Sequence, residues 1–430
     1  MTGGQGVAGS NPVNPTDSLA ERKFCRAFVV KRTCWTRSPP RRTWCSARTA
    51  DRVRVRAGPG GRHRERTADA KQADCHGCSS AGPFGGCSVH GNRQPRTGHS
   101  ASGVARAPST SGTAAPATPA VLATGLDAPW SIAFSDGVPL VSERDSGRIL
   151  ELNAEGSSRE VGVIADAAGS GEGGLLGIAV QDGVLFTYLT AGQENRIERR
   201  DLTGTAGALA LGPAETVLDG IPAGRVHNGG RIAFGPDGML YATTGDAGDR
   251  ESAQDRDSPS GKILRMTADG AAPGDNPFPG SLVYSYGHRN PQGIAWDPDG
   301  VLYASEFGQD TWDELNVIEP GGNYGWPEVE GIAGEAGFID PVQQWTPEDA
   351  SPSGIAVANG SVYIANLRGE RLRRVPLQDP AGAAESGGYG RLRDVVEAPD
   401  GSLWVLTNNT DGRGKPGPDD DRILRLSPGS

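Results

Sequence analysis

From Trp130 to the end of the chain one sequence pattern recurs six times, and it restricts the fold more than any other feature. Each copy begins with Ile-Ala or a similar pair and passes through a short turn that often reads Pro-Asp-Gly. An apolar strand and a second pair of strands follow. The copies begin at residues 132, 178, 232, 294, 355 and 395, so successive copies lie 40 to 62 residues apart.

Short alternating strands joined by Asp-Gly turns at this period are typical of propeller blades. One blade cannot bury both of its faces, so blades stack around an axis. We therefore predict an all-β fold over residues 120–430: a six-bladed β-propeller of four-stranded antiparallel blades. A solenoid or a two-sheet sandwich is the alternative. We expect the first strand of each blade to line the central channel and the loops at its mouth to form the site.

Longer connections interrupt two of the predicted blades. We assign the gap between Asp246 and Lys262 to the third blade, and the gap between Thr267 and Leu282 to the fourth. The fourth blade also carries a long tail, residues 316–345. Because insertions in a rigid scaffold often carry function, we expect the site on these adjacent blades.

Residues 1–119 differ from the rest of the chain and are predicted to be a disordered, low-complexity segment that ends in a linker, residues 107–119. Residues rich in Arg, Gly, Pro and Ser cannot bury enough surface to offset chain entropy. Cys75-His-Gly-Cys78, with Cys87 and His90, has a spacing compatible with zinc, but no hydrophobic pattern surrounds it. Alternatively, the start lies too far upstream and much of the segment is not made, because residues 9–12 (Gly-Ser-Asn-Pro) read like a translated transfer RNA gene.

The charge is divided unevenly. Residues 1–115 carry 19 Lys and Arg against 6 Asp and Glu, and the rest carries 23 against 46. An acidic body argues against nucleic acid or an anionic membrane surface as partner. No apolar run reaches the roughly 18 residues of a membrane span, and no export signal is visible at the start of the chain.

Residues 227–326 hold polar side chains in Gly-rich turns, and these are the candidates for chemistry. His227 and His288 are the only histidines of the predicted propeller. His227 is the natural general base, and Asp246 follows one strand later, where it can accept a hydrogen bond from the imidazole. The alternative for either histidine is a structural role.

Several further groups accompany these residues. Arg289, with Asn290 and Gln292 beside it, is suited to stabilise an oxyanion or simply to hold its loop. Arg391 and Arg393 alternate along a strand and point to one face, where two like charges need an anion between them; surface charge is the alternative. Oxygen ligands for calcium are offered around Gly308 by Glu306, Asp310, Asp313 and Glu314.

Seven motifs occur in the order found in one known family. They are Gly173-Gly-Leu-Leu-Gly177, His227-Asn-Gly-Gly-Arg231, Gly245-Asp246, Gly261-Lys-Ile-Leu-Arg265, Gly287-His-Arg-Asn-Pro-Gln-Gly293, Gly322-Asn-Tyr-Gly-Trp-Pro327 and Arg391-Leu-Arg-Asp394. On these motifs residues 120–430 resemble the soluble pyrroloquinoline-quinone (PQQ)-dependent sugar dehydrogenases, the glucose/sorbosone dehydrogenase family that includes the aldose sugar dehydrogenases. The resemblance implies a six-bladed propeller that oxidises aldoses at the anomeric CH–OH to lactones.

The resemblance also implies roles for individual residues. His227 would remove the proton of the anomeric hydroxyl, Asp246 would orient it, and Arg289 would stabilise the charge formed as hydride passes to the quinone. The quinone would be bound by Asn290, Gln292, Arg368, Arg391, Arg393 and Glu172. Calcium would be held at Gly308, Gln309, Glu314 and Tyr324, mainly through the main-chain carbonyls of the first two.

Four positions depart from the family pattern. Arg368 stands where a Lys is common, Glu172 where a Gln is common, Phe307 where a polar residue is common, and Gln309 where a Pro is common. Substrate preference is the property most affected, and the carboxylate at 172 could compete with the base or add to it.

Two other functions stay open from the sequence: a metal-dependent propeller hydrolase of the lactonase type, and a non-catalytic binding propeller. The resemblance implies a small sugar substrate, an external electron acceptor and a monomer or homodimer. It further implies work outside the cytoplasm, whether secreted, periplasmic or surface-anchored.

Overall fold

The structure is a computed structural model, and it describes residues 119–382 and 384–426. The expectations for residues 1–118, namely disorder, the zinc spacing and a displaced start, lie outside the described residues. Within them the chain forms β-strands with two single-turn 3-10 helices, η1 (Arg250–Ala253) and η2 (Pro380–Gly382). None of these helices has the length and hydrophobicity that crossing a bilayer requires.

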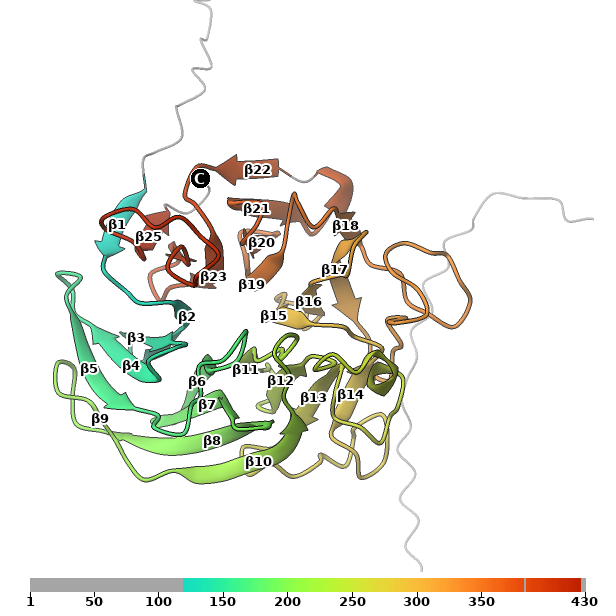
Figure 1. Cartoon of the computed structure of the whole chain (residues 1–430), viewed down its shortest axis with the longest axis horizontal. Helices are drawn as coiled ribbons and strands as arrows, with labels where there is room; N and C mark the ends of the chain where they lie inside the picture. The colour runs from blue at the N-terminus through green and yellow to red at the C-terminus, as the bar shows by residue number, and fades with distance from the viewer. Residues whose placement is uncertain (1–118, 383, 427–430) are drawn as a thin grey trace, which may run out of the picture. The chain divides into compact units, whose positions relative to one another are not determined.

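Six antiparallel sheets surround a central axis (Figure 1), which confirms the predicted six-bladed propeller. The first blade contains β2 (Pro129–Ser135), β3 (Val138–Glu143), β4 (Arg148–Leu152) and β5 (Ser158–Val163). The second contains β6 (Leu175–Gln181), β7 (Val184–Ala191), β8 (Glu194–Thr203) and β10 (Glu215–Pro222), and the short β9 (Ala210–Leu211) pairs with β8. The third contains β11 (Ile232–Phe234), β12 (Leu240–Thr244), β13 (Lys262–Met266) and β14 (Val283–Tyr286).

The last three blades follow in chain order, except that the sixth takes one strand from the start of the propeller. The fourth blade contains β15 (Pro291–Trp296), β16 (Leu302–Glu306), β17 (Asp313–Ile318) and β18 (Gln343–Trp345). The fifth contains β19 (Pro352–Ala358), β20 (Ser361–Asn366), β21 (Arg371–Pro376) and β22 (Ala384–Gly387). The sixth contains β23 (Leu392–Glu397), β24 (Leu403–Thr407) and β25 (Ile423–Leu426), and β1 (Ala120–Ala123) completes it.

The ring is closed by pairing the two ends of the propeller. Strand β1 lies antiparallel to β25, with Ala120 opposite Arg425, so the sixth blade contains strands from both ends (Figure 1). Separating the two ends would require breaking this pairing.

One assignment of the longer connections was wrong. Residues 267–282 join β13 to β14 and therefore belong to the third blade, not to the fourth. The connection 245–261 belongs to the third blade as predicted and contains η1, and the long tail of the fourth blade lies between β17 and β18. Both extra segments after Asp246 and Thr267 thus interrupt one blade.

The hydrophobic core is divided into six clusters, each of which lies between two neighbouring blades. Between the first two blades, for example, Leu140 and Ile149 pack against Leu175 and Ile178. Burying a side chain of this size contributes about 1.5–3 kcal/mol. The apolar residues that alternate along the strands therefore form a hydrophobic layer on both faces of each blade, against the blades on either side.

The first strand of each blade lies innermost, as Figure 1 shows and as the sequence predicted. Arg231, just before β11, crosses this inner region and donates to Asp394 of β23 (3.0 Å), to the Ser131 hydroxyl of β2 (3.0 Å) and to the Gln292 carbonyl of β15 (2.9 Å). Removing one partner of such a buried ion pair typically costs about 3–5 kcal/mol. The three hydrogen bonds of Arg231 therefore link four blades across the centre.

Candidate active site

Loops from several blades meet in a cavity of about 280 Å³ at one face of the propeller. Seven of the residues to which the resemblance gives a role line it: Glu172, His227, Arg289, Asn290, Gln309, Arg368 and Arg391. The cavity wall also includes Phe307, Pro347, Ser351, Leu367 and Arg413. Folding thus gathers residues that are separated by up to 241 positions in the sequence.

His227 occupies the wall in a conformation that a side-chain-bearing residue rarely adopts. Its φ is 60°, in the left-handed region, which costs on the order of 1–3 kcal/mol. Its N–H donates to Oε2 of Glu172 at 2.9 Å, and its carbonyl accepts the N–H of Ala247 at 3.1 Å. A Cβ on Gly245 would lie 1.9 Å from this carbonyl oxygen, so the close approach of the two loops requires glycine there.

Asp246 lies beneath the imidazole, as the sequence predicted. Its Oδ1 is 2.7 Å from Nδ1 of His227 and accepts the N–H of Gly248 at 2.8 Å, while Oδ2 accepts the indole N–H of Trp326 at 2.9 Å. Burial alone would raise the pKa of Asp246, but these three donors hold it below its ordinary value. The carboxylate is therefore ionised, and Nδ1 of His227 carries a proton that it donates to Asp246. With Nδ1 engaged in this way, Nε2 is the ring nitrogen that can accept a proton.

Glu172 is anchored at both oxygens. Beyond the bond to the His227 N–H, its Oε1 accepts from Arg413 at 3.0 Å. Burial acts to raise the pKa of Glu172, but the His227 N–H and the Arg413 guanidinium lower it below its usual value. Glu172 is thus a fixed anion in the wall that supports the main chain of the base.

Arg289 lies where the cavity meets a second, smaller one, and its guanidinium faces Trp326 at 5.4 Å from the ring. One terminal nitrogen donates to the Phe307 carbonyl at 3.1 Å. Burial lowers the pKa of Arg289, although Asp246 and Glu306 oppose that effect.

Arg391 and Arg393 converge, as their alternation predicted, and the anion between them belongs to the chain itself. Asp411 lies 2.9 Å from the guanidinium of Arg391 and 3.8 Å from that of Arg393. Arg391 lines the cavity, whereas Arg393 is buried behind it and donates to Gln292 at 2.8 Å. Gln292, like Arg393, therefore lies next to the cavity wall rather than in it.

Three buried donors at this site have no hydrogen-bond partner within the described residues: Nε of Arg289, Nδ2 of Asn290 and Nε of Arg393. Buried polar atoms are rarely left unpaired, and such exceptions often mark the place of a ligand. Three N–H donors, two of them cationic, suit an anionic molecule rich in oxygen. Arg368, more exposed, pairs with Glu348 at 2.9 Å at the edge of the cavity.

Neighbouring carboxylates accept N–H groups of the loop 307–312. Asp313 accepts the N–H of Gly308 at 2.9 Å, and Glu330 accepts the N–H of Gln309 at 2.5 Å. No hydrogen bond to the Gly308 or Gln309 carbonyl is found within residues 119–382 and 384–426. Carbonyl oxygens in this state are suitable ligands for calcium.

The other two predicted metal residues are less available. Oε1 of Glu314 accepts the Gly331 N–H at 2.7 Å, and Oε2 accepts from Asn316 at 3.1 Å. Burial and the nearby Glu306 raise the pKa of Glu314 to about 8. The Tyr324 hydroxyl donates to the Val317 carbonyl at 2.6 Å. In the part of the chain that the structure describes, no group of three or more His, Cys, Asp or Glu side chains is arranged to hold a metal ion.

The sequence alone did not identify three residues of this site: Trp326, Arg413 and Asp411. Trp326 lies within a motif that was recognised, but its contact with Asp246 spans 80 residues. Asp411 and Arg413 lie in a Gly-rich connection, 408–422, that carries no motif. Their partners could be found only from the fold.

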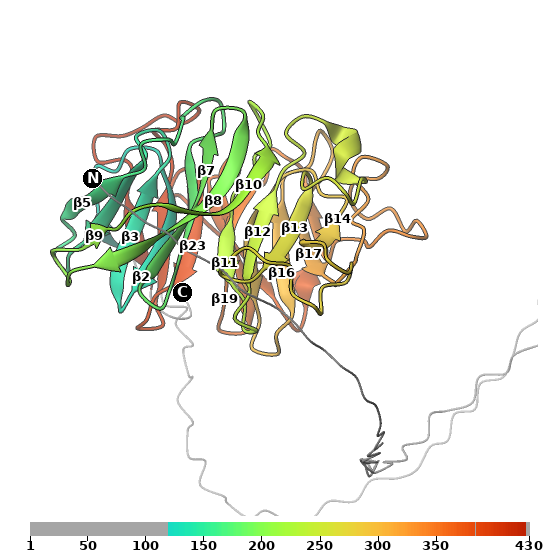
Figure 2. The same ribbon diagram turned by 90° about the horizontal axis from the view of Figure 1, so that it is seen from below.

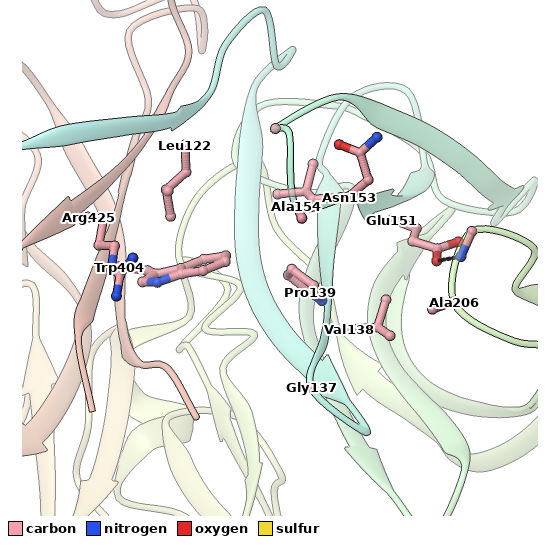
Figure 3. A pocket seen from close by; sticks show the side chains of 13 residues that line it. Leu122, Gly137, Val138, Pro139, Glu151, Asn153, Ala154, Ala206, Trp404 and Arg425 are labelled. Atoms are coloured by element: carbon pink, nitrogen blue, oxygen red, sulfur yellow. Dashed lines mark hydrogen bonds between the residues drawn. The ribbon is translucent and has the colours of Figure 1, made fainter. Parts of the chain in front are cut away.

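A larger cavity, of about 520 Å³, lies at the turns between strands rather than at the loops of the site (Figure 3). Leu122, Val138, Pro139 and Trp404 line it, and Glu151 lies at its edge. Apolar groups dominate this lining, and none of the candidate residues contributes to it.

The protein is a six-bladed propeller, and a His–Asp pair and several arginines surround one polar cavity in it. This arrangement is typical of an enzyme active site. Sequence comparison identifies its family: a model described as glucose/sorbosone dehydrogenase matches residues 126–424, and the chain belongs to that family.

Individual relatives agree with this assignment. The PQQ-bound structure of the aldose sugar dehydrogenase of Streptomyces coelicolor is 53% identical, with a TM-score of 0.68 over 73% of this chain and 99% of that one. The aldose sugar dehydrogenase of Escherichia coli is 30% identical over 73% of this chain and 94% of its own length. The quinoprotein glucose dehydrogenase B of Acinetobacter calcoaceticus is 32% identical over 56% of this chain and 59% of its own length.

Proposed function

We propose that this protein is a PQQ-dependent aldose dehydrogenase that oxidises the anomeric CH–OH of a sugar to the lactone. The observation that carries the proposal is the His227–Asp246 pair beside buried arginine and amide donors that have no partner. The choice of PQQ as the cofactor is supported by two relatives, since one similar structure contains PQQ and another relative is a quinoprotein.

The residues fit the quinone in charge and in hydrogen bonding. PQQ carries carboxylates and carbonyl oxygens, and the free donors of Arg289 and Asn290 in the cavity wall can serve such acceptors, while Arg393 adds positive charge behind the wall. Arg391 and Arg368 add positive charge at the cavity wall. When bound, the quinone supplies the acceptor for the hydride that leaves the anomeric carbon.

His227 acts as the general base in this proposal. Its Nδ1–H donates to Asp246, so Nε2 takes the proton of the anomeric hydroxyl as the C–H electron pair departs as hydride. Asp246 then stabilises the imidazolium. Arg289 offers its Nε–H to the negative charge that forms on the acceptor. Glu172 holds the main chain of the base and does not itself exchange the proton.

Calcium fits the loop 307–312 through the carbonyls of Gly308 and Gln309, because no hydrogen bond to these oxygens is found within residues 119–382 and 384–426. A calcium ion there would act as a Lewis acid toward the bound acceptor. Glu314 and Tyr324 would have to exchange their present partners to become ligands.

We further propose a small sugar as substrate, an external electron acceptor, a monomer or homodimer as the working form and a place outside the cytoplasm. The relatedness to aldose sugar dehydrogenases supports the sugar and the acceptor. The hydrolase and the binding-propeller alternatives leave the free arginine and amide donors without a purpose.

The test is reconstitution of the purified chain with PQQ and calcium. Dye reduction is followed with a panel of aldoses, and quinone binding is measured separately from the visible spectrum. We expect sugar-dependent reduction that His227→Ala abolishes while quinone binding persists, and a loss of activity on chelation that calcium restores. A chain that binds no quinone at all would overturn the proposal.

A further inference from the structure

A buried carboxylate next to the site grips three consecutive residues of the catalytic loop. Glu306, at the end of β16, is only 3% exposed. Its Oε1 accepts the N–H of Arg289 and the N–H of Asn290, the latter at 3.3 Å, and its Oε2 lies 2.8 Å from Nδ1 of His288. Glu306 and His288 do not line the 280 Å³ cavity, whereas Arg289 and Asn290 do.

His288, the second histidine of the propeller, is fully buried and has both ring nitrogens occupied. A carboxylate only accepts, so Nδ1–H donates to Glu306, and Nε2 forms a hydrogen bond of 2.8 Å with the Ser285 hydroxyl. The ring also stacks on Tyr324, with centroids 4.7 Å apart and planes at 17°. His288 therefore cannot reach a substrate, but it fixes the orientation of Glu306.

The residues that Glu306 holds are in turn bonded to the loops of the base. The carbonyl of Arg289 accepts the N–H of Asp246 at 2.8 Å, and Oδ1 of Asn290 accepts the N–H of Gly229 at 3.0 Å. One carboxylate thus sets the position of the arginine directly, and it reaches the His227 loop and the Asp246 loop through one further hydrogen bond each.

We propose that Glu306, oriented by His288, is a positioning residue that aligns Arg289 and Asn290 with the His227–Asp246 pair. The inference rests on the proposed function for its catalytic consequence, but not for its structural one. Substitutions behind a catalytic group, at residues that orient it, commonly cost about 10- to 100-fold in activity.

The informative variant is Glu306→Gln, because the amide can keep every hydrogen bond. Its oxygen accepts the two N–H groups, and its NH2 donates to His288 if the imidazole proton moves to Nε2. Only the charge is lost, and charge-assisted hydrogen bonds are about twice as strong as neutral ones. His288→Gln weakens the same unit from the other side.

Glu151→Gln is the matched control. Glu151 is likewise 3% exposed, and it accepts the N–H groups of Gly207 and Leu209 far from the site, at the edge of the cavity in Figure 3. Glu151 also forms an ion pair with Arg159, so Glu151→Gln loses the same charge together with a cationic partner. A general effect of the lost charge on folding therefore appears in both variants.

The first readout is amide hydrogen exchange of the quinone-free full chain. We expect Glu306→Gln and His288→Gln to speed exchange at Gly229 and Asp246 by about tenfold relative to strands of the second blade, and Glu151→Gln to leave both amides unchanged. Equal acceleration throughout the propeller would reduce Glu306 to a residue of the fold and overturn the proposal, as would unchanged exchange.

The second readout is steady-state kinetics after reconstitution with PQQ and calcium. We expect kcat of Glu306→Gln to fall about 10- to 100-fold, with the sugar KM changed less than about threefold. An unaltered kcat in an active wild-type background contradicts the inference. An inactive wild type contradicts the proposed function instead, while the exchange experiment still decides the positioning role.

Discussion

Nδ1 of His227 lies 2.7 Å from Oδ1 of Asp246, and the other oxygen of the same carboxylate accepts the Trp326 indole N–H at 2.9 Å. With a donor at each oxygen the carboxylate cannot rotate, and its charge is turned toward the imidazole. The pair therefore fixes both the tautomer and the direction of the base before any substrate arrives.

Asp246→Asn tests this arrangement. The carboxylate serves three N–H donors, and the amide has only one acceptor oxygen for them. Either Trp326 loses its partner, or Gly248 and His227 do, unless the imidazole changes tautomer. We expect kcat to fall about 10²- to 10⁴-fold, as when the orienting carboxylate of a catalytic histidine is neutralised. Stopped-flow dye reduction measures it. Asp136→Asn, at an exposed turn, serves as the control, and a nearly unchanged kcat would show that Asp246 does not orient the base.

The fold could be predicted because its determinants are local. The alternation along each strand recurs in every blade, as does an Asp-Gly turn, which the fifth blade replaces with Asn359-Gly360. These features require no knowledge of distant contacts. The pairing of Ala120 with Arg425 has no local signature, so the closure of the ring was missing from the prediction. The misplaced connection 267–282 has the same origin, since a turn pattern does not tell which two strands it joins.

The contact between His227 and Asp246 was predicted because both residues lie in recognisable motifs. The predicted site was incomplete wherever a partner comes from another blade. The alternation of Arg391 and Arg393 indicated that an anion must lie between them, but only the structure identifies Asp411 as that anion. The Glu172–Arg413 contact spans 241 residues and follows from the ring closure.

Substitutions at Glu172 distinguish an anchor from a second base. Glu172→Gln keeps an oxygen for the His227 N–H, so we expect kcat to stay within about threefold of wild type. Glu172→Ala removes that acceptor from a residue held at φ 60°, and kcat should fall about tenfold or more.

Arg413→Ala removes the ion-pair partner of Glu172 and leaves the carboxylate in place. Because Arg413 is half-exposed, its loss should change the free energy of unfolding by less than about 1 kcal/mol.

The two Glu172 variants decide between the anchor and the second base. A Glu172→Gln variant as inactive as Glu172→Ala would show that the carboxylate takes part in the proton transfer.

Asp411→Asn should destabilise the protein in a pH-dependent way. Burial acts to raise the pKa of Asp411, but Arg391 and Arg393 lower it below its usual value. An acid with a depressed pKa in the folded state adds stability above its unfolded pKa of about 3.9 and loses it as the pH falls through the folded value.

The variant should therefore be less stable than wild type by about 3–5 kcal/mol at pH 7, because two arginines lose their shared anion. The difference should shrink below about pH 4, as wild-type Asp411 becomes protonated. Urea denaturation across this range measures both quantities. A difference that is independent of pH would mean that the charge of Asp411 does not contribute.

Gly245→Ala tests whether the approach of the two loops sets the geometry of the base. The new Cβ would lie 1.9 Å from the His227 carbonyl oxygen, a distance that cannot be tolerated, so the loop carrying His227 must move. A displacement of about 1 Å at a reacting group can cost about 100-fold. We expect kcat to fall by about that factor and unfolding free energy to fall by about 1–3 kcal/mol, since overpacking is relieved only by backbone shifts.

Gly274→Ala separates this effect from a general cost of adding a methyl group. No atom lies within 4 Å of the Cβ that alanine would place there, and its φ is outside the left-handed region. Its activity should match wild type, and its stability should be equal or slightly higher, because alanine restricts the unfolded chain by about 0.4–1 kcal/mol. If both variants keep full activity, the His227 loop tolerates the shift, and the close contact at Gly245 does not determine the geometry of the base.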